Sequence, residues 1–329
     1  MTILTHETAL NNFHEQVAYV LRNYASHGRK VNEFDHVIIG GLGGSGIGGK
    51  IARLAFYTSF PIPIEVISEY KLPAFANQRT LVILNSYSGN TEETLSMYAD
   101  AKSKGCTMMV LTSGGSLAEM AQKDGLPVYF SEAGFQPRMA LGYSLCTLLM
   151  ILADLIEYDM GSQLEKVRVN LENNKSMRFR AEEMLHYFMP HVHHKYVLIC
   201  DLALEAVATR FCQQIQENAK GEAFVSILPE ANHNMIESYY SRHDTNFILL
   251  NSGVNERNTL RFHYLKKVLE QHGNKIFEYP LDHFGFASIF EIIHTMDWLS
   301  ILISNEKGVN NLVVENINGL KGFLESNAS

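Results

Sequence analysis

A glycine-rich segment near the N-terminus has the residue types of a loop that approaches a ligand closely. It reads GGLGGSGIGG from Gly40 to Gly49 and lies between a predicted strand and a predicted helix. Its G-x-G-x-x-G spacing from Gly41 fits a dinucleotide-binding loop, and Glu65 follows where an acidic ribose ligand would lie. A tight turn alone also explains the glycines. A phosphate site, with Gly44 and Ser45 against the anion, is a further interpretation.

A second loop favours the phosphate interpretation. SYSGNTEET, from Ser86 to Thr94, follows a predicted strand and opens a predicted helix. Helix N-termini expose unpaired N–H groups and partial positive charge, so the hydroxyls of Ser86, Ser88 and Thr91 would make a phosphate cradle without a lysine. Ordinary N-capping by Thr91 needs only one hydroxyl. In an NAD-linked enzyme these three hydroxyls have no obvious task.

The composition limits the class of protein. The chain has 329 residues, 46% hydrophobic and 19% charged, which allows two domains with cores of their own. The apolar stretch Leu145 to Ile156 is about 12 residues long, against the roughly 20 that span a bilayer. The start of the chain has no signal-peptide pattern, and the four cysteines form no CxxC pair. We therefore expect a cytoplasmic protein without membrane association.

Charge argues against nucleic acid as the main partner. The formal net charge is -8, and no cluster of Lys and Arg is present. A small anion would therefore need a positive potential made by local geometry.

An internal repeat organises the chain. Three short apolar runs, each suited to a strand buried on both faces of a parallel sheet, recur in order, with helical patterns between them. Val37 and Val197 are 160 residues apart, and Asn85 and Asn251 are 166 residues apart. The pattern predicts an α/β fold with two doubly wound parallel-sheet domains in tandem, of flavodoxin-like type.

The predicted boundaries follow from that repeat. We expect an N-terminal domain over 1–155, a helical linker over 156–190 with a helix pair at 162–190, and a C-terminal domain over 191–329. Residues 1–24 are predicted to be helical. A last helix at 314–324 is predicted to pack back onto the body of the protein.

Five motifs in order resemble one family. GGSG and SYSGNTEET are similar to the sugar isomerase (SIS) domain, and FQPRMALGY, QENAKGEA and LPEANHN extend the likeness along nearly the whole chain. Together they resemble the bifunctional phosphoglucose/phosphomannose isomerases, which have two SIS domains. The second copy lacks both glycine-rich and hydroxyl-rich loops, so we expect one phosphate site per chain. The resemblance implies aldose–ketose isomerisation of hexose 6-phosphates without a cofactor, in a homodimer.

The resemblance also implies roles for four side chains. Glu217, near the end of a predicted helix, would be the base that moves the proton between C1 and C2. A carboxylate at the negative end of a helix dipole holds a proton more readily, which suits that task. His233 would open the sugar ring, either in the site of its own chain or, by analogy with the family, in the partner subunit's site. Arg138 would stabilise the enediolate, and Lys321 would assist proton movement at the sugar oxygens.

Alternatives remain for each of these residues. Most helix glutamates are solvated, Arg138 could form a surface ion pair, and a lysine on a C-terminal helix is normally exposed. The family commonly has Thr-Pro where this chain has Leu312 and Val313, which puts the mannose activity in doubt.

Two alternatives concern function. A phosphosugar-binding protein without turnover would need only the phosphate loops. The histidines at 191–194 have no carboxylate at ligand spacing, so we expect no metal.

Overall fold

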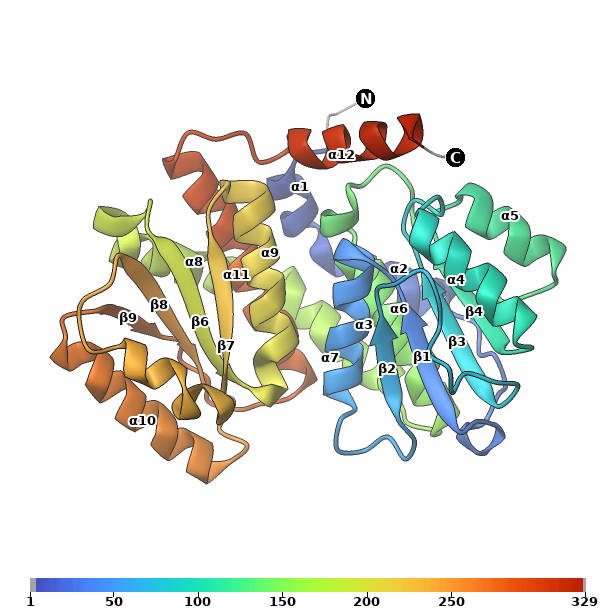
Figure 1. The fold of residues 1–329 in the computed structure, drawn as a ribbon, viewed down its shortest axis with the longest axis horizontal. Coiled ribbons are helices and arrows are strands. Elements are labelled where there is room, and N and C mark those ends of the chain that lie inside the picture. Colours follow the sequence, from blue (N-terminus) through green and yellow to red (C-terminus); the bar gives the residue numbers. More distant parts are fainter. Residues whose placement is uncertain (1–3, 328–329) are drawn as a thin grey trace.

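Two all-parallel sheets form the framework of the molecule (Figure 1). The computed structural model describes residues 4–327. The first sheet has the strand order β2-β1-β3-β4-β5. Its strands are β1 (His36–Gly40), β2 (Ile64–Ile67), β3 (Thr80–Asn85), β4 (Thr107–Thr112) and β5 (Val128–Phe130). This is the flavodoxin-like order, so the predicted fold class is confirmed for the first repeat.

Both faces of the first sheet are covered by helices. Val37, Leu81 and Met109 pack on one face with α3 (Gly43–Ala55) and α6 (Leu141–Leu155). Alternate residues, such as Ile38 and Val82, pack on the other face with α4 (Glu92–Ser103) and α5 (Gly115–Lys123). Strands buried on both faces explain why the sequence shows apolar runs without polar alternation.

The second sheet repeats this arrangement with four parallel strands in the order β7-β6-β8-β9. They are β6 (Lys195–Asp201), β7 (Ala223–Leu228), β8 (Thr245–Leu250) and β9 (Lys275–Glu278). One face packs on α10 (Glu256–Gln271). The other face packs on α8 (Lys175–Phe188), α9 (Glu205–Ala219) and α11 (Phe286–Glu306). The second repeat is therefore also doubly wound.

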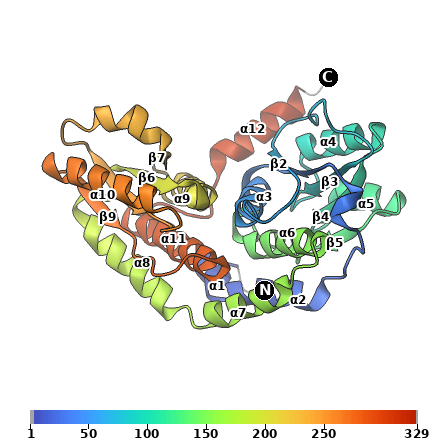
Figure 2. The ribbon, with the colours of Figure 1, turned by 90° about the horizontal axis from the view of Figure 1, so that it is seen from below.

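One hydrophobic cluster joins the two sheets. It includes residues of α2 (Phe13–Asn23), α6, α7 (Met160–Glu172), α8 and α11. Figure 2 shows α7 between the helices of the two halves. α1 (His6–Asn11) precedes α2, so the predicted N-terminal helix is two helices that break at Asn12. The predicted helix pair at 162–190 is observed as α7 and α8.

Three features differ from the sequence predictions. The short strands β2 and β5 were missed because β2 is half-buried and β5 has only three residues. The longest apolar helix is α11 rather than the stretch at 145–156. By length and composition α11 could cross a membrane, but 78% of its apolar window is buried inside the molecule.

The third difference is the last helix, α12 (Glu315–Ser326). We expected it to pack onto the body, but Ile317, Leu320 and Phe323 are exposed. The helix extends from the end of α11 towards the side of the first sheet (Figures 1 and 2). Its apolar residues therefore contribute nothing to the core.

Candidate active site

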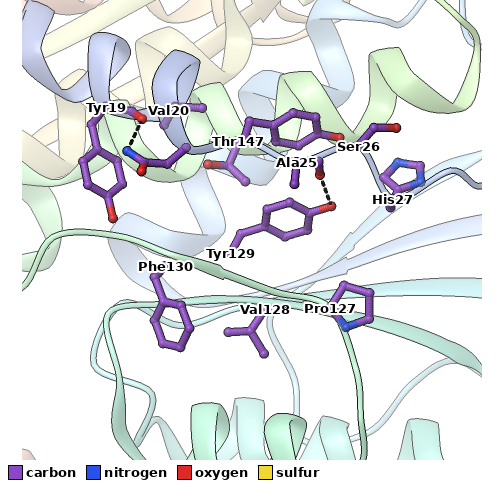
Figure 3. Close-up of a pocket in the computed structure, with 12 residues that line it drawn as sticks. Tyr19, Val20, Ala25, Ser26, His27, Pro127, Val128, Tyr129, Phe130 and Thr147 are labelled. Atoms are coloured by element: carbon purple, nitrogen blue, oxygen red, sulfur yellow. Dashed lines mark hydrogen bonds between the residues drawn. The ribbon is translucent and has the colours of Figure 1, made fainter.

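One cavity of the molecule lies away from the predicted site residues. It has a volume of about 580 Å³ and lies between α2 and β5, lined in part by Tyr19, Tyr129 and Phe130 (Figure 3). None of the nine predicted site residues lines it. The five predicted phosphate residues instead lie at the carboxyl ends of β1 and β3, and Arg138 and Glu217 lie in elements that face them.

The two predicted phosphate loops meet at the switch point of the first sheet, where α3 and α4 begin. The Ser45 hydroxyl accepts a hydrogen bond from the Tyr87 backbone N–H at 3.2 Å, which joins the loops. Ser86 and Thr91 share a hydrogen bond of 2.8 Å between their hydroxyls. Ser45 and Ser86 are buried, and Ser88 is exposed. The structure therefore brings the four hydroxyl-bearing residues to one place.

Neither helix N-terminus at this switch point is capped by a side chain. Leu42 precedes α3 and Thr91 precedes α4, and neither makes a side-chain cap hydrogen bond. Ordinary N-capping by Thr91, the alternative considered above, is therefore not what this hydroxyl does. Uncapped N–H groups beside grouped hydroxyls are the ingredients of an anion site.

Two glycines in these loops are needed for close packing. A Cβ on Gly44 would lie 2.9 Å from the carbonyl oxygen of Pro137, so the loop touches the segment that carries Arg138. A Cβ on Gly89 would overlap the carbonyl oxygen of Gly114, and Gly89 has a positive φ of 69°. Gly89 thus permits the close contact between these two loops.

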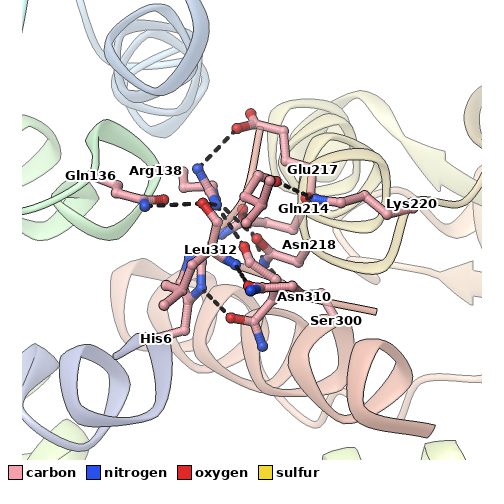
Figure 4. Close-up of polar contacts among 12 residues, drawn as sticks. His6, Gln136, Arg138, Gln214, Glu217, Asn218, Lys220, Ser300, Asn310 and Leu312 are labelled. Carbon is pink, nitrogen blue, oxygen red and sulfur yellow. Dashed lines mark hydrogen bonds and ion pairs between the residues drawn. The ribbon is translucent and has the colours of Figure 1, made fainter. Parts of the chain in front are cut away.

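Arg138 lies at the centre of a buried polar network (Figure 4). It belongs to a 3-10 turn, Pro137–Met139, ahead of α6, and is only 6% exposed. Nη1 lies 3.3 Å from Oε2 of Glu217, and Nε donates to Oδ1 of Asn218 at 2.9 Å. Burial lowers the pKa of the guanidinium, and the nearby Glu217 carboxylate opposes that effect. The interpretation of Arg138 as a surface ion pair is wrong.

Glu217 lies in the last turn of α9, next to the first sheet's site. Its side chain is 29% exposed, so it combines contact with Arg138 and access to solvent. The neighbouring Asn218 is buried and donates to the Ser300 hydroxyl of α11 at 2.9 Å. A half-buried carboxylate beside a buried guanidinium can exchange protons with a bound molecule.

A buried ion pair contacts this network through the backbone of Arg138. Arg210 of α9 donates to both carboxylate oxygens of Asp297 of α11, at 3.1 and 2.6 Å. Its Nη2 also donates to the Arg138 carbonyl oxygen at 3.0 Å. The backbone of the 3-10 turn is therefore fixed to the second half of the molecule.

Three polar residues that contact this network were not among the predicted site residues. Gln136 and Lys220 donate to backbone carbonyls just before α12, and His6 contacts Asn311 at 3.1 Å between Nδ1 and Oδ1. Burial lowers the pKa of His6 to about 4. Gln136 and Lys220 lie inside the FQPRM and ENAK motifs. Their closeness in sequence to Arg138 and Glu217 was the signal that could have indicated them as site residues.

Two predicted residues stand apart from the network. His233 lies in a 3-10 turn, Glu230–His233, after β7, and its side chain is exposed. Lys321 lies on α12 and is also exposed. In the part of the chain that the structure describes, neither side chain forms a hydrogen bond or ion pair with Arg138 or Glu217. Among residues 4–327, no three His, Cys, Asp or Glu side chains gather in a way that could hold a metal.

The switch point of the second sheet is built differently. Asp201 ends β6, and its Oδ2 accepts hydrogen bonds from both the N–H and the hydroxyl of Ser252, at 3.0 and 2.6 Å. The helix α10 is capped by Asn255, which accepts from the Asn258 N–H at 3.1 Å. A carboxylate thus binds the donors of Ser252 and a side chain caps α10, although α9, like α3, begins without a side-chain cap.

Comparison with known proteins gives matches to one profile and to several relatives. The profile described as the bacterial phospho-glucose isomerase C-terminal SIS domain matches residues 191–324. A hypothetical protein from Thermus thermophilus has a similar fold, with a TM-score of 0.74 at 17% identity over 98% of this chain and 90% of its own. This likeness concerns the fold alone.

Two relatives carry the stronger evidence. The bifunctional phosphoglucose/phosphomannose isomerase of Caldicellulosiruptor bescii is 33% identical over 95% of this chain and 97% of its own. That of Aquifex aeolicus is 31% identical over 91% of this chain and 93% of its own. The identity extends through both sheets and the segment between them. The chain therefore belongs to the bifunctional phosphoglucose/phosphomannose isomerase family.

Proposed function

We propose that this protein interconverts glucose 6-phosphate, mannose 6-phosphate or both with fructose 6-phosphate. The observation that carries the proposal is the contact chain from the phosphate loops to the acid–base group. Gly44 packs directly on the Pro137–Arg138 backbone, and Arg138 contacts Glu217 at 3.3 Å. A phosphate held at one end would thus place a sugar carbon chain near the carboxylate.

In this proposal the phosphate is bound by hydroxyls and backbone N–H groups. Ser45, Ser86, Ser88 and Thr91 surround the starts of α3 and α4, with the Gly44 backbone beside them. The partial positive charge of two helix N-termini favours a dianion. In this way an acidic chain would hold a phosphate without a lysine.

Isomerisation then requires a proton to move between C1 and C2. Glu217 would take the proton from one carbon and return it to the other, while the Nη1 edge of Arg138 stabilises the negative oxygens of the enediolate. Neither residue changes its net protonation over the cycle. Lys321 would assist proton movement at the sugar oxygens if α12 approaches the site.

The decisive test is a coupled isomerase assay of the wild type and Glu217→Gln. General acid–base catalysis contributes roughly 100- to 10,000-fold, so kcat of the variant should fall by about that factor. Glu222→Gln, in the loop before β7, is the matched control and should keep the wild-type rate. Binding of glucose 6-phosphate with no turnover by the wild type would instead support a non-catalytic phosphosugar-binding protein.

His233 is proposed to open the sugar ring in the partner subunit's site of a homodimer. Its side chain is exposed and, within residues 4–327, forms no hydrogen bond or ion pair with Arg138 or Glu217 of its own chain, which supports this assignment. Inactive Glu217→Gln and His233→Ala proteins can be mixed under subunit exchange. A shared site leaves one intact site in each heterodimer, so activity should return. Activity that stays absent after confirmed exchange would show that His233 acts within its own chain.

Substrate preference is proposed to favour the glucose epimer. Leu312 stands where the family commonly has threonine, so a hydroxyl is missing beside the site. Leu312→Thr should raise kcat/KM for mannose 6-phosphate relative to glucose 6-phosphate. An unchanged ratio would contradict this assignment.

The boundaries and the setting are also proposals. We infer an N-terminal SIS domain over 1–155, a helical linker over 156–190 and a C-terminal SIS domain over 191–329. A cytoplasmic homodimer that does not bind nucleic acid or membranes fits the family and the composition. Sedimentation velocity would test the dimer directly.

A further inference from the structure

A short connecting segment lies against the candidate site, and three side chains donate hydrogen bonds to its backbone. The strap, residues 310–313, leads from α11 to α12. Its carbonyl oxygens at Asn311, Leu312 and Val313 each accept a hydrogen bond from a side chain (Figure 4). These three contacts hold the strap through its backbone, and the Asn311 side chain adds bonds with His6 and Ser304, each at 3.1 Å.

The donors come from both halves of the molecule. Arg138 Nη2 donates to the Asn311 carbonyl at 2.7 Å, and Gln136 Nε2 donates to the Leu312 carbonyl at 3.1 Å. Both lie in the segment before α6. Lys220, from the end of α9, donates to the Val313 carbonyl at 2.6 Å. The strap therefore bridges the two halves across the Arg138–Glu217 pair.

The position of Lys220 depends on an unusual backbone. Lys220 has φ of 51° and ψ of 42°, a left-handed conformation that is uncommon for a residue with a Cβ. Its ammonium also donates to the Glu217 carbonyl. The bond to the Glu217 carbonyl is explained by its role in closing the end of α9. The bond to the Val313 carbonyl is not explained in this way.

The strap limits which donors Arg138 can offer. Nε is bound to Asn218, and Nη2 is bound to Asn311 at 2.7 Å and faces the Leu312 carbonyl at 3.4 Å. Nη1 alone faces Glu217. Two of the three guanidinium nitrogens thus fix the plane of the group, and the third is directed at the carboxylate.

We propose that Gln136 and Lys220 are positioning residues, which hold the strap so that the strap carbonyls orient Arg138 with its Nη1 edge towards Glu217. This inference rests on the proposed function, in which Arg138 stabilises the enediolate. The strap also sets where α12 begins, because the described side chains of α12 are exposed and the strap is its link to the body. Gln136 and Lys220 act through other groups and need not touch the sugar.

The test compares four variants of the full chain. Gln136→Met and Lys220→Met keep the approximate length of the side chains but remove the donors. Lys220→Arg restores a donor, and Lys267→Met removes an exposed lysine of α10 as the matched control. For each protein, kcat and KM for glucose 6-phosphate are measured together with amide hydrogen exchange of residues 310–324.

The expected result separates positioning from structure. Arg138 acts on charge that develops in the transition state, so kcat should fall about tenfold in either Met variant with KM within about twofold. Exchange in 310–324 should accelerate in both. Lys220→Arg should recover kcat to within about twofold of the wild type, and Lys267→Met should match the wild type throughout.

Three results would overturn the proposal. These are unchanged exchange of the strap, an unchanged kcat in both Met variants, or a rise in KM alone, which would place the side chains on the substrate. A wild type without isomerase activity would refute the proposed function instead. The exchange of the strap in Gln136→Met and Lys220→Met would then still decide whether these residues hold it.

Discussion

The two sheets carry different side chains at their switch points. We call these switch points crevices; they lie at the carboxyl ends of β1 and β3 in the first sheet and of β6 and β8 in the second. At the first switch point, Ser86 follows β3, and the starts of α3 and α4 lack side-chain caps. At the second, Ser252 takes the corresponding position after β8, but it donates twice to the buried Asp201 carboxylate. In the first crevice the loop hydroxyls bond to one another and to loop N–H groups, and both helix starts stay without a side-chain cap. In the second, a carboxylate accepts both Ser252 donors and a side chain caps α10. The same backbone arrangement thus carries different side-chain contacts at the two switch points, in line with the proposal that only the first binds phosphate.

The register shows that this comparison involves equivalent positions. Gly40 pairs with Leu84 in the first sheet, and Cys200 pairs with Leu250 in the second. The next residues are therefore Gly41 and Asp201. A Cβ on Gly41 would lie 2.8 Å from the carbonyl oxygen of Asn85, so the two loops of the first sheet pack directly on each other. At the equivalent position of the second sheet, Asp201 places a carboxylate that binds Ser252.

The largest effect should come from giving the first crevice a carboxylate. Ser86→Asp places a negative charge beside the proposed phosphate site. Two unit charges about 4 Å apart at an effective dielectric constant of about 20 repel by about 4 kcal/mol, so KM for the sugar phosphate should rise about 1000-fold. Ser86→Asn has the same shape without the charge and should lose far less. Equal losses in the two variants would mean that charge does not distinguish the crevices.

The next effect concerns His6, which contacts Asn311 of the strap. The pKa of His6 is lowered by burial to about 4, so the unfolded chain takes up the proton first. The contribution of His6 to the free energy of unfolding therefore has its full value above about pH 6.5, and it falls by up to about 3 kcal/mol as the pH approaches about 4. Urea unfolding between about pH 7.5 and about pH 4.5 measures this loss. His6→Gln should flatten the profile, though His294, whose pKa is also lowered by burial, keeps some slope.

A smaller effect should follow from removing the Asp201 carboxylate from the second crevice. Asp201→Ala removes the acceptor for two hydrogen bonds and should destabilise the fold by about 2 kcal/mol in urea unfolding. The KM for the sugar phosphate should stay the same, because the proposed site lies in the first sheet. Asp201→Asn keeps an acceptor and serves as the control. A raised KM in Asp201→Ala would mean that the second crevice takes part in binding.

The smallest effect compares the residues at the starts of α4 and α10. Asn255 caps α10 through its side chain, so Asn255→Ala should cost about 1 kcal/mol of stability. Thr91 does not cap α4, so Thr91→Ala should change the free energy of unfolding by less than about 0.5 kcal/mol. The KM of the Thr91→Ala variant for the sugar phosphate should rise several-fold instead. Equal stability losses would remove the distinction between a capped and an uncapped helix.

Local patterns explain which elements the sequence revealed. The buried strands β1, β3, β6 and β8 are continuous apolar runs, because helices cover both faces. The strands β2 and β5 lie at the sheet edges or are short, so their sequences carry little signal. The last helix was predicted correctly as a helix, but its apolar residues indicated packing that does not occur.

The sequence by itself determined the α/β repeat and the hydroxyl-rich loops, and its motifs indicated Glu217 and Arg138, because periodicity and composition are local properties. The tertiary structure alone decided that Gly44 lies against Pro137 and that Arg138 is buried against Glu217. It also revealed the strap, whose acceptors are backbone carbonyls common to every residue type. Contacts between residues far apart in the chain depend on how the two sheets pack, and no local pattern records that packing.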